Sequence, residues 1–80
     1  MLTIYSQTNC PNCVYAEHRL MEFGIPFQTV KIDQDSEARE FIISRGYRTV
    51  PQIFRGSDIF IEGGWLGLKR LRWRFLVEIP

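Results

Sequence analysis

The sequence has few cysteines, one histidine and little net charge, and each shortage argues against a class of protein. Ten basic residues against nine acidic ones leave a formal charge of +1, which argues against a general nucleic-acid binder. No apolar run comes near the roughly 18 residues that a membrane-spanning helix needs. Two cysteines and one histidine are too few for a four-ligand zinc site. We therefore expect a protein that uses no metal, no nucleic acid and no membrane.

The length of 80 residues predicts one domain, residues 1–80. Its 45% hydrophobic and 24% charged residues are ordinary for a globular protein. The first residues, MLTIY, show neither the basic region nor the long apolar stretch of a secretory signal. We therefore expect a cytoplasmic monomer. In that reducing compartment, a closely spaced cysteine pair is more often catalytic or metal-binding than structural.

Both cysteines lie in the short stretch TNCPNCVY. Cys10 falls where a predicted strand passes into a predicted helix, close to the helix N-cap. Unpaired backbone N–H groups and the positive end of the helix dipole would stabilise its thiolate. Cys13 lies one helical turn later on the same side and should be more covered. The spacing therefore predicts a catalytic pair in which Cys10 attacks and Cys13 resolves.

Two other uses of the cysteine pair compete with catalysis. A structural zinc site would need further ligands, and only His18, which we expect at the surface or partly packed, is a candidate. A structural disulfide that closes so short a loop would constrain the unfolded chain little, and cytosolic thiols would reduce it. Both alternatives explain the pair less well than thiol chemistry does.

The apolar pattern and the turn signals predict the element order β-α-β-α-β-β-α. We expect strands over residues 2–6, 27–32, 52–55 and 58–62. We expect helices over residues 11–23, from the DQDSE stretch to about residue 45, and from residue 63 to about 76. The first β-α-β unit should be parallel and the closing hairpin antiparallel. This is an α/β chain of the minimal thioredoxin-like fold, with a four-stranded mixed sheet flanked by helices.

Three stretches of the sequence resemble the glutaredoxin family, and the likeness covers about residues 2–72. They are CPNC after the first strand, TVPQIF at 49–54, and Gly63-Gly64 before the last helix. The resemblance implies a dithiol glutaredoxin, a glutathione-dependent thiol–disulfide oxidoreductase that reduces protein disulfides and glutathione mixed disulfides. It implies glutathione as co-substrate and no tightly bound cofactor. Ribonucleotide reductase is the electron acceptor to test first.

The resemblance also assigns roles to single residues. Pro51 matches the family's cis-proline, whose loop faces the dithiol, and Val50 would offer its backbone to the cysteinyl unit of glutathione. Gly63 and Gly64 would let the γ-glutamyl carboxylate approach the last helix, although a simple turn also explains them. The other expected contacts are Arg48 and Thr49 in the glutathione site and Pro11, Asn12 and Tyr15 on the rim of the dithiol.

Two positions depart from the glutaredoxin pattern. Many glutaredoxins have a lysine three residues before the first cysteine, where this chain has Gln7. The family commonly has an aspartate after the double glycine to hold the γ-glutamyl group, whereas Trp65-Leu66-Gly67 follow here. Arg48 would replace part of the missing positive charge. The signature for glutathione binding is therefore weaker than the signature for the fold.

These departures favour an alternative within the same fold. The stretch RGYRTVP at 45–51 resembles the NrdH-type glutaredoxin-like redoxins, hydrogen donors of ribonucleotide reductase that accept electrons from thioredoxin reductase and bind glutathione poorly. Gly64-Trp65 approximates the glycine–aromatic pair of those redoxins. Against this, Pro11 and TVPQIF are typical of glutaredoxins. We prefer the glutaredoxin interpretation and keep the NrdH-type redoxin as the alternative.

Two further classes of function stay open. A glutathione-ligated iron–sulfur dimer is typical of single-thiol members of the family, so Cys13 argues against it. The basic stretch KRLRWR at 69–74 suggests contact with an anionic surface. We prefer a solvated basic face on a helix whose Leu68, Leu71 and Phe75 point inward.

Overall fold

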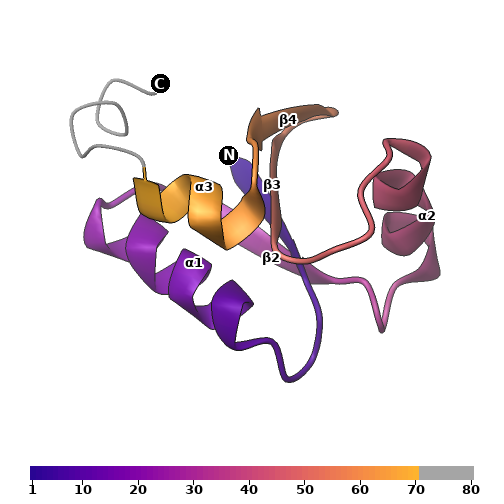
Figure 1. Ribbon diagram of the computed structural model, residues 1–80, viewed down its shortest axis with the longest axis horizontal. Helices are drawn as coiled ribbons and strands as arrows, with labels where there is room; N and C mark the ends of the chain where they lie inside the picture. The colour runs from indigo at the N-terminus through magenta and orange to yellow at the C-terminus, as the bar shows by residue number, and fades with distance from the viewer. Residues whose placement is uncertain (71–80) are drawn as a thin grey trace.

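The computed structural model describes residues 1–70 as a four-stranded sheet with helices on both faces (Figure 1). The elements are β1 (Leu2–Ser6), α1 (Pro11–Glu22), β2 (Phe27–Lys31), α2 (Ser36–Ser44), β3 (Gln52–Arg55), β4 (Asp58–Ile61) and α3 (Gly64–Arg70). This order is the predicted one, with most predicted boundaries within a residue of those observed. The expected extension of the last helix to about residue 76, with Leu71, Arg72, Arg74 and Phe75, lies outside the described residues.

The strands lie in the order β2-β1-β3-β4. β1 pairs in parallel with β2, so that Ser6 stands beside Lys31 at the carboxyl ends of both strands. β3 pairs antiparallel with β1 and with β4, with a register shift between Ile53 and Phe54. The mixed sheet and its closing hairpin are as predicted. The parallel pair matters for function because it brings the loops after β1 and β2 to one edge of the sheet.

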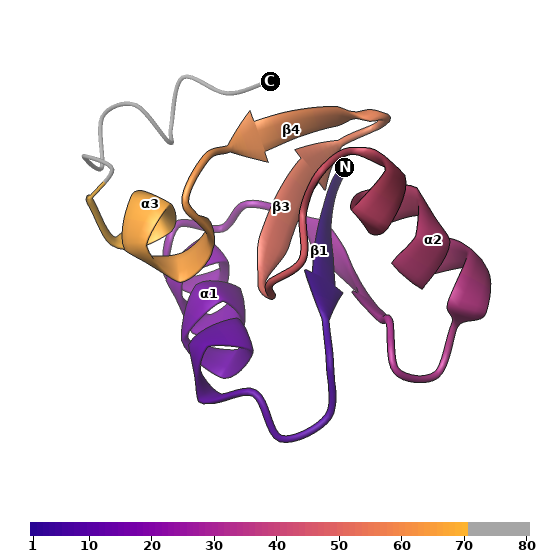
Figure 2. The ribbon, with the colours of Figure 1, turned by 45° about the vertical axis from the view of Figure 1, so that its right-hand side comes forward.

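One face of the sheet is covered by α1 and α3, which lie side by side (Figure 2). Leu2 and Ile4 point to this face because alternate residues of a strand share a side. The buried core here consists of Leu2, Ile4, Ala16, Leu20, Ile53, Ile61 and Leu68. Each buried aliphatic side chain of this size contributes roughly 1.5–3 kcal/mol. This core fixes α1, and with it both cysteines, against the sheet.

The opposite face of the sheet is covered by α2 (Figure 2), and aromatic rings pack between them. Phe54, 1% exposed, is at the centre, and its ring centroid lies 5.4 Å from those of Tyr5 and Phe41 and 5.7 Å from that of Tyr47. On α2, Ile42 is buried, while Phe41 and Ala38 are half-buried. The cluster therefore anchors both α2 and the segment that follows it.

Each of the first two helices begins at a capping residue that its local sequence supplies. Cys10 is the N-cap of α1, and Pro11 follows at the first helical position, where a missing N–H costs nothing. Asp35 caps α2, and its carboxylate accepts a hydrogen bond of 3.1 Å from the Ala38 N–H. Gly24, at φ +66°, follows the end of α1. No helix within residues 1–70 is long and apolar enough to cross a membrane.

Candidate active site

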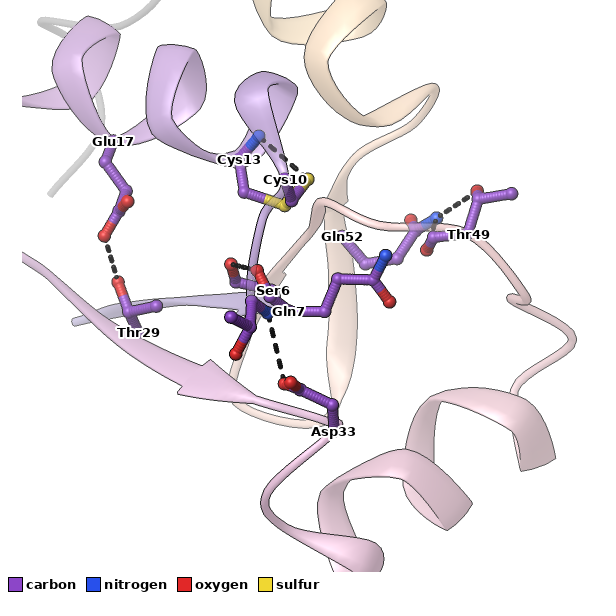
Figure 3. Close-up of a disulfide and its surroundings, with 10 residues drawn as sticks. Ser6, Gln7, Cys10, Cys13, Glu17, Thr29, Asp33, Thr49 and Gln52 are labelled. Atoms are coloured by element: carbon purple, nitrogen blue, oxygen red, sulfur yellow. Dashed lines mark hydrogen bonds between the residues drawn. A yellow bond between two sulfur atoms is a disulfide. The ribbon is translucent and has the colours of Figure 1, made fainter.

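Cys10 and Cys13 are joined by a disulfide at the start of α1, with their Cα atoms 5.3 Å apart (Figure 3). Cys13 is 1% exposed because it lies on the inner side of α1. Cys10 is half-buried and lines the surface hollows described below. An external thiol or disulfide therefore meets Cys10 before Cys13, as the sequence predicts.

The sulfur of Cys10 lies at the positive end of α1. As N-cap, Cys10 has extended backbone angles, and its Sγ accepts a hydrogen bond of 3.2 Å from the Cys13 N–H (Figure 3). Its carbonyl oxygen accepts from the N–H groups of Cys13 and Val14 at 3.1 and 3.2 Å. The first turn of α1 contains no acidic residue. After reduction, the same N–H groups and dipole would stabilise a thiolate on Cys10.

The segment opposite the dithiol is the loop that ends at Pro51. The peptide bond between Val50 and Pro51 is cis, as the resemblance implies. Gln52 is buried, and its Nε2 donates hydrogen bonds to the Thr49 carbonyl at 2.9 Å and to the Thr49 hydroxyl at 3.2 Å (Figure 3). Gln52 is not among the residues predicted for the site. Its amide holds the backbone just before Val50 in place.

Two surface hollows flank this loop. The first, the dithiol hollow, has a volume of about 500 Å³ and runs from Cys10 to Arg48, Thr49 and Val50. The second, the glycine hollow, also has about 500 Å³ and is lined by Val50, Gly63, Gly64 and Trp65 among others. Asn12, Thr49 and Val50 line both hollows. Each lies in the size range of small-molecule sites.

Gly64 has a packing role that the sequence alone did not reveal. It is buried at φ +56°, and a Cβ placed on it would lie 2.5 Å from the carbonyl oxygen of Pro51. The start of α3 therefore approaches the proline loop so closely that only glycine fits. Gly63, at φ +85°, is exposed beside it. Both glycines are needed for the turn and the close approach, whether or not a ligand binds there.

An aromatic pair joins α1 to α3, and its member Tyr15, expected on the rim of the dithiol, lines neither hollow. Tyr15, 52% exposed, lies with its ring centroid 5.6 Å from that of the half-buried Trp65, so the pair links α1 to α3. The expected rim residues Pro11 and Asn12 are exposed and line the dithiol hollow. Trp65 thus lies in the stretch after the double glycine, where glutaredoxins commonly have an aspartate.

Tyr47 is not among the residues predicted for the site, but it connects the loop before β3 to the loop before α3. Its hydroxyl donates a hydrogen bond of 3.2 Å to Oε1 of Glu62, which directly precedes Gly63. Burial and this bond to the carboxylate raise the pKa of Tyr47. Tyr47 also lines the glycine hollow. No local sequence pattern marks a tyrosine–glutamate pair separated by 15 residues.

Other predicted candidates lie apart from the dithiol. His18 is exposed on α1, and Lys69 and Arg70 are exposed near the end of the described chain. Within residues 1–70, no group of three or more His, Cys, Asp or Glu side chains is placed to hold a metal ion. Lys31, which the sequence analysis did not select, lines a hollow of about 580 Å³ on another side of Cys10. It is a cation near the dithiol in a chain that has Gln7 at the family's lysine position.

Comparison with known proteins gives the family. The family model described as glutaredoxin matches residues 2–60. The glutaredoxin-like protein NrdH of Lactococcus lactis is 35% identical over 60 residues, which are 75% of this chain and 83% of the relative. Glutaredoxin 3 of Escherichia coli is 44% identical over 52 residues, which are 64% of this chain and 63% of the relative.

Solved structures give the fold. The buckwheat glutaredoxin–glutathione complex superposes with a TM-score of 0.75 at 28% identity, covering 96% of this chain and 73% of that one. The NrdH-redoxin of Escherichia coli superposes with a TM-score of 0.73 at 22% identity, covering 99% of this chain and 93% of that one. The thioredoxin-like fold predicted from the sequence is confirmed. With its CxxC pair at the start of α1, the chain belongs to the glutaredoxin family of thiol–disulfide oxidoreductases.

Proposed function

We propose that the protein is a dithiol glutaredoxin in which Cys10 attacks disulfides and Cys13 resolves the intermediate. One observation carries the proposal: Cys10 caps α1 in a hollow shared with Val50, while Cys13 is buried one turn behind it. A thiolate at the helix start gains from the dipole and the backbone N–H groups, and the buried thiol lies within reach for the second step. We further propose that residues 1–80 act as one cytoplasmic, monomeric domain.

The proposed reaction has two exchanges. The Cys10 thiolate attacks one sulfur of a substrate disulfide, forms a mixed disulfide with it, and releases the other sulfur as a thiolate that takes up a proton. Cys13, once deprotonated, attacks the Cys10 sulfur, releases the substrate as a thiol, and leaves the Cys10–Cys13 disulfide that the structure contains. Two glutathione thiols then reduce this disulfide in turn and leave as glutathione disulfide. A stabilised Cys10 thiolate helps mainly in the last step, in which Cys10 leaves its mixed disulfide with glutathione, because low basicity weakens Cys10 as an attacking thiolate.

Glutathione is the proposed electron donor, lying along both hollows. Its cysteinyl unit would pair with the backbone of Val50, its glycyl carboxylate would lie near Arg48, and its γ-glutamyl end would reach Gly63 and Gly64. The buckwheat structure, described as a glutathione complex and 28% identical, supports glutathione as the ligand. Protein disulfides and glutathione mixed disulfides are the proposed substrates, with ribonucleotide reductase the first acceptor to test.

The role proposed for Arg48 is open to a direct kinetic test. Arg48→Ala should raise the KM for glutathione about fivefold and leave kcat nearly unchanged, because an exposed ion pair contributes up to about 1 kcal/mol to binding. Arg55→Ala is the matched control, since Arg55 is equally an exposed arginine but lines neither hollow. Equal KM values for the two variants would remove Arg48 from the glutathione site.

Three observations favour an NrdH-type redoxin as the second candidate. Gln7 lines the dithiol hollow without a charge, and Trp65 and Leu66 line the glycine hollow where glutaredoxins commonly hold the γ-glutamyl group. The Lactococcus lactis NrdH relative matches over 83% of its own length. In this alternative, thioredoxin reductase supplies the electrons and Cys10 and Cys13 keep their roles.

The two candidates differ in what reduces the oxidised protein. The test mixes the disulfide form with glutathione and glutathione reductase, or with thioredoxin reductase, each with NADPH, and counts alkylated cysteines by intact mass. Reduction by the glutathione system, at least about tenfold faster than by the other, is the result expected for a glutaredoxin. The reverse preference would establish the NrdH-type redoxin instead, and reduction by neither would contradict both.

A further inference from the structure

In the loop between β1 and α1, the residue before the N-cap has an unusual backbone conformation. Asn9, immediately before Cys10, has φ +59°, a left-handed angle that non-glycine residues seldom adopt and asparagine tolerates best. Within residues 1–70 it is the one non-glycine residue at positive φ. Such an angle persists only where surrounding contacts hold it. Because Asn9 directly precedes the N-cap, its backbone sets the direction in which the Cys10 sulfur points.

The contacts that hold this loop come from the turn that follows β2, the strand that pairs in parallel with β1. The Thr8 N–H donates a hydrogen bond of 3.2 Å to Oδ1 of Asp33, and Nε2 of Gln34 donates one of 3.4 Å to the Thr8 hydroxyl. Figure 3 shows the Asp33 carboxylate directed at the loop that precedes Cys10. The Ile32 N–H donates to the Ser6 carbonyl at 2.8 Å, so the chain is already paired one residue before Asp33. Asp33, two residues beyond the end of β2, thus reaches the active-site loop through a hydrogen bond.

We propose that Asp33 is a positioning residue for the Cys10 thiol, acting by holding Thr8 and thereby the left-handed turn at Asn9. With this turn in place, the Cys10 sulfur lies over the backbone N–H of Cys13 at 3.2 Å. Without it, Asn9 relaxes to an ordinary backbone angle, the N-cap geometry loosens, and the Cys10 thiolate loses part of its stabilisation. The inference rests on the proposed role of Cys10 as the attacking thiol.

A purely electrostatic role for Asp33 has the opposite sign. The charged groups facing Asp33 are Lys31 on β2, Arg39 on α2 and Arg48 in the loop before Pro51. A carboxylate near a thiol disfavours the thiolate, so removing only the charge would make Cys10 more reactive. Removing the hydrogen bond makes Cys10 less reactive. Hydrogen bonding by Thr8 holds the pKa of Asp33 below its usual value, so Asp33 stays charged above about pH 5 and the assay reports on Cys10.

The test measures how fast Cys10 of the reduced full chain reacts with iodoacetamide between pH 5.5 and 9, with the modified residue located by mass spectrometry. Asp33→Ala should slow alkylation at pH 6 about fivefold and shift the pH profile upward, the effect of losing one hydrogen bond. Asp33→Asn keeps an oxygen that accepts from Thr8 and should stay within about twofold of the wild type. Asp58→Ala, at an equally exposed aspartate in the β3–β4 hairpin, should leave the rate unchanged.

The outcomes separate cleanly. Alkylation of Asp33→Ala as fast as the wild type, or faster, would overturn the inference, and so would equal slowing in Asp33→Asn. Asp33→Ser, which also lacks an acceptor long enough to reach Thr8, should be slowed like the alanine variant and replaces it if that variant does not fold. A wild-type Cys10 no more reactive than Cys13 would contradict the proposed function itself, independently of Asp33.

Discussion

Cys10→Ser should abolish disulfide reduction, whereas Cys13→Ser should stop the reaction after its first step. A serine hydroxyl at the helix N-cap remains protonated at neutral pH and cannot attack sulfur, so we expect turnover to fall by on the order of a thousandfold or more. In Cys13→Ser, the half-buried Cys10 still attacks, but the serine at the buried position one turn behind it cannot release the substrate. Mixed disulfides with protein substrates should therefore accumulate.

Turnover with a protein disulfide, and the mass of the trapped adduct, measure the two effects. Cys13→Ser should also retain glutathione-dependent cleavage of glutathione mixed disulfides, because that reaction needs only the Cys10 thiol. Since both variants replace sulfur by oxygen at neighbouring positions, each serves as the other's control for folding. If Cys13 proved to be the faster-alkylated thiol, the two roles would have to be exchanged.

Gly64→Ala should destabilise the protein by about 3 kcal/mol and disturb the active site as well. A left-handed backbone angle costs a non-glycine residue roughly 1–2 kcal/mol. In addition, a Cβ at this position meets the Pro51 carbonyl oxygen at 2.5 Å, and forcing apart well-packed atoms costs about another 1–3 kcal/mol. The strain is relieved by moving the proline loop away from α3. Val50 lies in that loop and lines both hollows, so the KM for glutathione should rise too.

Gly56→Ala is the matched control for this substitution. Gly56 has φ +62°, close to the +56° of Gly64, but a Cβ there meets no atom within 4 Å. We therefore expect Gly56→Ala to lower the free energy of unfolding only by the cost of the left-handed backbone angle, about 1–2 kcal/mol. The KM for glutathione should not change. Urea unfolding with a common m-value measures both variants. Equal losses at the two glycines would show that the contact with Pro51 contributes nothing to stability.

Local signals were enough to predict most of the fold. The β-rich run LTIYS predicts β1, and Pro11, Gly24 and Pro26 predict the limits of α1 to within one residue. Gly56-Ser57 predicts the β3–β4 turn. The sequence analysis also predicted that Cys10 would lie near the N-cap and Cys13 on the buried face of the same helix. These features depend on residues within a few positions of one another, so the local sequence carries the signals for them.

Contacts between distant segments were decided only by the tertiary structure. Asp33 reaches Thr8 because β1 and β2 pair in parallel and end together. Tyr47 joins Glu62, and Gly64 packs against Pro51, because the segments on either side of the β3–β4 hairpin return to the same edge of the sheet. The sequence by itself thus determined which residues carry the thiol chemistry and which element holds them. The surroundings of those thiols depend on side chains whose separation along the chain says nothing about their distance in space, and only packing the sheet brings them together.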